Sequence, residues 1–363
     1  MIIYLISELL LYLSFAILAG TFIIAIVPNE KKPTISIHKR WLQLSILGIV
    51  LFSAMPVVQI VEYLYQGVGL SLTLTNVINN FEVGRAWTLI LILSIFYYLL
   101  ISVFPVQQKK SYAVLALVFL FILILAVGWA SHAASLTEWS GFAFHTTHFT
   151  AVSVWIGVLF IVSWFSKDTK NWNALLKWYS PLAIVCFILT MISGFYMMSL
   201  VVDLTDYTNS WLLDYGQALL IKHLFIIPLL VFAFFNGMWM KRRLNQNPQF
   251  NPKPWVRGES LLLLFIFSAT AFLGQSSPPH EIESTIKTNG VSALFQFFYG
   301  GTVAGVSQVQ FSLTTFSFVF MLLAAIFLSL LIYSFRKKAP AIFAFFMSFL
   351  SVLSIYLSFM TSF

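Results

Sequence analysis

The stretch SYAVLALVFLFILILAVGWA, residues 111–130, contains no charged side chain. About 20 apolar residues in a helix span the hydrocarbon core of a bilayer, whereas transmembrane barrel strands are about ten residues long and alternate in polarity. This stretch does not alternate, so it predicts a transmembrane helix. Similar runs recur at about 2–27, 42–65, 85–105, 141–165, 177–200, 215–240, 255–274, 311–333 and 341–361. The sequence therefore predicts an all-α, polytopic bundle of about ten transmembrane helices, within a range of eight to ten.

The composition agrees with a membrane protein and disfavours several other classes. The 363 residues are 60% hydrophobic and only 9% charged, whereas soluble domains carry about 25% charged residues. The single cysteine, Cys186, excludes a disulfide framework and a CxxC metal pair. The chain has no GxxxxGK[ST] loop for ATP. It also has no HExxH and no nucleophile spaced suggestively with a histidine and a carboxylate, so we do not expect an enzyme.

The net charge of +8 indicates topology rather than a nucleic-acid partner. Every basic residue except Arg85, Lys222 and Lys287 lies in a connection that follows an odd-numbered helix. The positive-inside rule places these connections in the cytoplasm, so both termini are expected to be extracytoplasmic. The first apolar run lacks a basic n-region and a convincing cleavage site, so we interpret it as a helix rather than a signal peptide. We expect residues 1–363 to form a single integral membrane domain.

Histidines gather on the outer side of this predicted topology. In FAFHTTHFTAVSVWIG, residues 142–157, His145 and His148 are three apart and share a helix face. His223 lies in the seventh helix on a stripe with Gly216, where a small residue allows a neighbouring helix to approach closely. His132 ends the fourth helix, His280 follows two prolines in the longest outer loop, and the cytoplasmic His38 is expected to be an ordinary solvated residue.

Several imidazoles at one membrane level favour a metal site. A single histidine on an apolar face is more often a hydrogen-bonded packing residue, but polar groups inside a membrane are costly and usually functional. Imidazole binds copper, zinc, iron and nickel, and thioethers favour Cu(I). The candidate ligands are His145, His148, His223, His132, Met198 and Met197, where both methionines lie near the outer end of the sixth helix.

Two polar residues in the cytoplasmic half have a structural interpretation. Asn236, deep in the seventh helix, is expected to hydrogen-bond to a neighbouring helix. Glu259 follows Arg257 at the inner end of the eighth helix. We expect it to form an ion pair at the membrane interface.

An ordered set of short motifs resembles the CopD copper-resistance family. That family combines a GHA-type histidine, an H-L-L-A-x-x-x-W-x-G-G helix, an S-G, a Y-G-Q-L-L-x-x-K helix and an E-x-x-x-G…P-P helix. This sequence has SHAA at 131–134, HFTAVSVWIGV at 148–158, SGFY at 193–196, YGQALLIKH at 215–223, RGESLLLLF at 257–265 and QSSPPH at 275–280. The match covers about 128–280, inside a CopD-like core of about 111–280. The flanking helices 1–105 and 311–361 match only by hydropathy and order.

The resemblance implies a multi-pass copper protein of the bacterial cytoplasmic membrane. Such a protein moves copper across the membrane or passes it to extracytoplasmic partners, and a CopC-like copper-binding protein would here be a separate chain. The sequence departs from the family where Val158 replaces the second glycine of W-x-G-G, which is expected to loosen one helix contact. It also departs at His145, three residues before His148, the first histidine of the H-L-L-A helix motif, where it adds a possible ligand.

Two other functions remain open at this stage. A b-type haem held by His148 and His223 as axial ligands would also use facing helices. A copper-related assembly factor would need its histidines only for packing. The copper oxidation state, Cu⁺ or Cu²⁺, the direction of transport and a role for His280 are left open.

Overall fold

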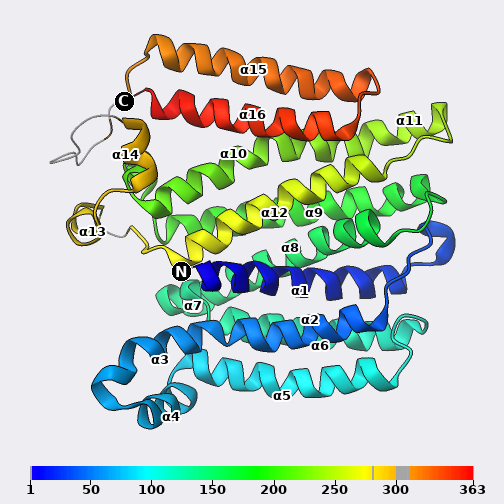
Figure 1. Cartoon of the computed structure of the whole chain (residues 1–363). Coiled ribbons are helices and arrows are strands. Elements are labelled where there is room, and N and C mark those ends of the chain that lie inside the picture. The colour runs from blue at the N-terminus through cyan, green and yellow to red at the C-terminus, as the bar shows by residue number, and fades with distance from the viewer. Residues whose placement is uncertain (1, 280–281, 300–308, 310, 363) are drawn as a thin grey trace. The chain divides into compact units, whose positions relative to one another are not determined.

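The computed structural model describes residues 2–279, 282–299, 309 and 311–362, and its long segments are helices (Figure 1). In that part of the chain, ten helices are long and apolar enough to cross a bilayer, and no β-strand forms. The predicted all-α fold and the number of spans are therefore confirmed.

The chain divides into two compact units, Met1–Leu200 and Val201–Phe363. The first unit contains α1 (Ile2–Ile26), η1 (Asn29–Lys31), α2 (Lys39–Ser53), α3 (Met55–Val68), α4 (Leu70–Asn80), α5 (Glu82–Val103), α6 (Lys110–Trp129), α7 (His132–Thr137), α8 (Trp139–Phe165) and α9 (Trp172–Ser199). The second contains η2 (Leu204–Asp206), η3 (Asn209–Leu212), α10 (Asp214–Phe234), η4 (Phe235–Trp239), α11 (Met240–Gln246), α12 (Lys253–Gln275), α13 (Ile282–Asn289), α14 (Ala293–Tyr299), α15 (Thr315–Arg336) and α16 (Ala341–Met360).

Two spans differ from their predicted form for local reasons. The second span, predicted at 42–65, consists of α2 and α3, which are separated at Ala54. Pro56 has no N–H to donate to α2, so the helical ladder is interrupted there. The ninth span begins at Thr315 rather than near 311 because Thr314 and Ser317 form a capping box.

In the first unit, α1 packs against α2, α6 and α8. The backbones of α1 and α8 are in direct contact. A Cβ added to Gly20 would overlap the carbonyl of Gly157, and a Cβ added to Gly157 would overlap the carbonyl of Ala16. Small residues of this kind let membrane helices approach closely where no hydrophobic effect drives their association. This crossing fixes α8, which carries His145 and His148, against α1.

In the second unit, α10 packs against α12 and α16, and α15 pairs with α16 as a helical hairpin (Figure 1). The long helix that starts with α10 widens at η4, which is a single π-helical turn, before it continues as α11. Single π-helical turns are rare in proteins, and those that occur are often found at functional sites.

Candidate functional site

His148 is held against α9 through one side of its ring. Its Nδ1 lies 3.1 Å from the carbonyl oxygen of Thr190 and 3.1 Å from the hydroxyl of Ser193. A carbonyl can only accept, so this hydrogen bond places the proton on Nδ1 and the lone pair on Nε2. Metal-binding histidines are oriented in the same way, with the second ring nitrogen donating to a carbonyl or carboxylate.

The SGFY motif of α9 supplies this contact. Ser193 provides the hydroxyl, and a Cβ added to Gly194 would lie 3.2 Å from Cε1 of His148. The glycine therefore leaves room for the imidazole. The sequence contains both residues, but their role as the support of His148 appears only when α8 and α9 are placed side by side.

His145 lies on the same helix but has different neighbours. Its ring centroid is 6.2 Å from that of Phe149, which packs edge-on against Tyr12 and Phe15 of α1. Nδ1 of His145 is buried and has no hydrogen-bond partner in the described part of the chain. An unsatisfied buried polar atom costs about 1–3 kcal/mol, so a bound ligand would offset this cost.

His223, in α10, contacts the loop that precedes α10 in its own unit. The hydroxyl of Tyr207 lies 2.7 Å from Nδ1 of His223. Burial raises the pKa of Tyr207 to about 12, so the phenol stays protonated at neutral pH. A phenol both donates and accepts, and its oxygen can accept from Nδ1–H in the tautomer that leaves Nε2 for a metal.

The YGQ motif anchors the loop that carries Tyr207. A Cβ on Gly216 would overlap the carbonyl of Ser210, so the expected close approach is made by η3 and not by a neighbouring helix. Gln217 donates to the carbonyl of Trp211 at 2.6 Å and accepts from the hydroxyl of Tyr356 at 2.6 Å. Sequence analysis missed Tyr207, because no local pattern connects it to His223.

The remaining candidates are more exposed or are not described. His132 is exposed at the first position of α7, and Met197 and Met198 are half-buried near the C-terminal end of α9. His280 lies outside the described residues. Within the described ranges, no group of three or more His, Cys, Asp and Glu side chains is close enough to hold a metal ion. His38 is exposed and caps α2 by accepting from the amide of Arg40.

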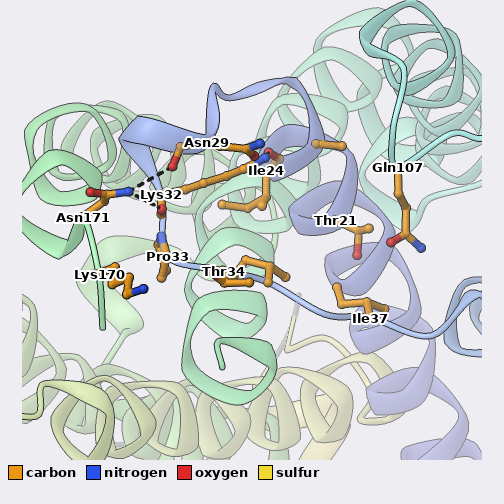
Figure 2. A pocket seen from close by; sticks show the side chains of 12 residues that line it. Thr21, Ile24, Asn29, Lys32, Pro33, Thr34, Ile37, Gln107, Lys170 and Asn171 are labelled. Carbon is orange, nitrogen blue, oxygen red and sulfur yellow. Dashed lines mark hydrogen bonds between the residues drawn. The ribbon is translucent and has the colours of Figure 1, made fainter. Parts of the chain in front are cut away.

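A cavity of about 350 Å³ lies at the opposite, basic end of the first unit (Figure 2). Its polar lining comes from the end of α1, the η1 segment and the loops before α6 and α9, and consists of Thr21, Asn29, Lys32, Thr34, Gln107, Lys170 and Asn171. Burial lowers the pKa of Lys32, whose ammonium donates to the carbonyl of Ile24 at 2.7 Å. Ammonium, amide and hydroxyl groups do not suit a soft cation, so this cavity is not a copper site.

The ten apolar helices of spanning length in the described residues make this chain a multi-pass membrane protein. The family described as "Copper resistance protein D" matches residues 173–273, and its "Copper resistance protein D-like, N-terminal domain" matches residues 1–142. The chain belongs to the copper resistance protein D family. It is therefore a copper-resistance or copper-transport protein of a membrane.

The N-terminal match extends the resemblance, because sequence motifs had assigned only residues from about 128 onward. No curated protein matches the chain. No solved structure matches it either.

Proposed function

We propose that this chain carries copper ions across the cytoplasmic membrane of a bacterium and captures them at a histidine site on the extracytoplasmic side. Both termini are extracytoplasmic in this proposal. The ligands are drawn from His145, His148 and His223, with His132, Met197 and Met198 as further donors near the outer surface. Copper is the cargo, and a separate CopC-like protein supplies or receives it.

The hydrogen bond from His148 to Thr190 is the observation that carries this proposal. A packing histidine can also hydrogen-bond, but a metal ligand requires this tautomer, in which Nε2 is unprotonated and its lone pair is directed. His145 supports the proposal because its buried Nδ1 lacks a protein partner among the described residues. Imidazole nitrogen ligands bind Cu²⁺, and a pair of them can also bind Cu⁺. Nearby thioether ligands would favour Cu⁺.

Metal analysis of the purified protein tests the proposal directly. We expect copper to co-purify with the wild type, to be lost from His223→Ala and to be retained by His38→Ala, which removes a histidine on the cytoplasmic side. The optical spectrum of the same samples separates the alternatives. A Soret band without copper would establish haem instead, and a protein free of both would support an assembly role.

Removing the Tyr207 hydroxyl is expected to weaken copper binding without abolishing it. Tyr207→Phe keeps the ring packed against Trp211 but takes away the partner of Nδ1 of His223. Loss of such an outer-shell partner typically costs about 10–100-fold in metal affinity. Competition titration with a copper chelator measures the change, and Tyr333→Phe, at an exposed ring of α15, is the matched control. An affinity equal to that of the wild type would contradict a role for the Tyr207–His223 pair.

A further inference from the structure

Glu259 and Asn236 form a buried polar pair that copper capture does not use. Glu259 lies in α12 and is 3% exposed, and Asn236 lies in the π turn η4 and is 4% exposed. Nδ2 of Asn236 donates to Oε2 of Glu259 at 2.7 Å and to the carbonyl of Trp255 at 3.2 Å. The expected bond from Asn236 to another helix is confirmed. The expected interfacial ion pair of Glu259 is corrected, since its carboxyl is buried and bonded to Asn236.

Aromatic rings enclose the pair. Phe335 stacks on Phe235 with ring centroids 4.6 Å apart and meets Trp255 at 4.8 Å, while Phe232 lies 5.8 Å from Trp255. Such rings exclude water and lower the local dielectric constant. An ionised carboxylate in this environment is costly unless it is paired and hydrogen-bonded.

The charged groups nearest the pair in sequence lie on α11 and at the start of α12, and others lie further along the neighbouring helices. Arg243 of α11 donates to the carbonyl of Phe335, and Arg336 of α15 stands over the ring of Trp239. The titratable groups of α10 lie toward its N-terminal end, about 20 Å or more from Asn236 along the helix at 1.5 Å per residue. They are Asp214, Tyr215, Lys222 and His223. The other packed elements carry Tyr356 on α16, Lys241 and Arg242 on α11, Tyr333 on α15, and Lys253 and Arg257 near the start of α12.

One amide donor satisfies only a fraction of the acceptor capacity of a carboxylate. Proton binding removes the negative charge of Glu259, and Asn236 can hydrogen-bond to both the ionised and the protonated carboxyl. Its Nδ2 donates to the ionised carboxylate. After rotation of the amide, Oδ1 accepts from the protonated carboxyl. Oδ1 of Asn236 is buried and has no partner in the described residues, which leaves it available for this second role.

We propose that Glu259 and Asn236 form a proton-binding site inside the membrane, which exchanges protons with the cytoplasmic side and couples its protonation state to transport of the cation. Glu259 is six residues, or about 9 Å, from the start of α12, and this end of the helix carries the basic residues assigned to the cytoplasm. The proton comes from water, adds to a carboxylate oxygen and leaves by the same route. The coupling rests on the proposed copper transport, but the proton site does not.

Infrared difference spectroscopy of the purified protein in lipid tests the proton site without copper. We expect a pH step to produce a protonated-carboxyl band that is absent from Glu259→Gln. Glu283→Gln, an exposed residue of α13, is expected to keep the band. In Asn236→Leu the protonated-carboxyl absorption should be present at every pH, because the carboxylate has lost its donor, so the band should disappear from the pH-difference spectrum. A Glu259→Gln spectrum identical to that of the wild type would overturn the site.

Copper uptake into proteoliposomes tests the coupling. Wild-type initial rates are expected to change about tenfold across two pH units on the cytoplasmic side, as expected for control by one titrating group. Glu259→Gln, which resembles the protonated form, should transport at a rate independent of pH. A rate that follows sodium instead of pH, or an unchanged pH profile in Glu259→Gln, would overturn the coupling. Absence of uptake by the wild type at every pH would refute copper transport, while the infrared result would still decide the proton site.

Discussion

Replacement of His148 by alanine is expected to strip copper from the purified protein and to lower its copper affinity by more than about 100-fold, since loss of even an outer-shell partner costs about 10–100-fold. In the proposed site, Nε2 of His148 binds the cation, while Nδ1 is held by Thr190 and Ser193. Copper content and chelator competition, measured on protein of normal elution volume, give the result.

A graded series separates ligation from packing. Ser193→Ala removes one of the two groups bonded to Nδ1 and keeps the Thr190 carbonyl, so we expect a loss of about tenfold or more. His38→Ala should change neither copper content nor affinity, because that exposed side chain caps α2 on the cytoplasmic side of the predicted topology. Wild-type copper binding by His148→Ala would show that this imidazole only packs against α9.

Alanine at position 20 is expected to destabilise the protein, although the change adds a single methyl group. The new Cβ would overlap the carbonyl of Gly157, and a backbone atom cannot rotate away as a side chain can. Overpacking of this kind costs about 1–3 kcal/mol, so thermal unfolding in detergent should begin several degrees lower. Because α8 would be displaced, copper affinity should fall as well.

The same substitution at Gly67 is the matched control. Gly67 also lies in a helix, α3, but a Cβ there would have no heavy atom within 4 Å. Gly67→Ala should therefore leave stability unchanged or raise it by up to about 1 kcal/mol through helix propensity. Equal thermal stability of the two variants would contradict the proposed α1–α8 backbone contact.

The spans could be predicted from the sequence because a bilayer imposes one length and one polarity on every crossing. The helices differ from the predicted spans where local backbone interactions interrupt or shorten them. Pro56 interrupts the second span, the Thr314–Ser317 capping box delays the ninth, and the π turn at Phe235–Trp239 leaves no mark on hydropathy. Hydropathy also gave no sign of α4 in the loop between the second and third spans, since its residues are not continuously apolar.

The candidate ligands could be named from the sequence, but their supports could not. An intramembrane histidine is conspicuous by its cost, whereas Thr190, Ser193 and Tyr207 are ordinary residues until the fold places them beside a ring nitrogen. Glu259 was misinterpreted because Arg257 is near it in sequence, although residues two apart on a helix do not face each other. The ligand set itself stays a prediction.

The glycine contact between α1 and α8 restricts how the first unit can move. The backbones of α1 and α8 are in direct contact at Gly20 and Gly157. Because no side chains lie between them there, we expect the two helices to move together as one rigid body. The α9 helix differs, since Pro181 breaks its hydrogen-bond ladder, and Thr190 and Ser193 lie beyond that break. Bending of α9 at Pro181 would move Thr190 and Ser193 away from the His148 ring. In the proposed site this would weaken cation binding, while α1 and α8 keep their positions.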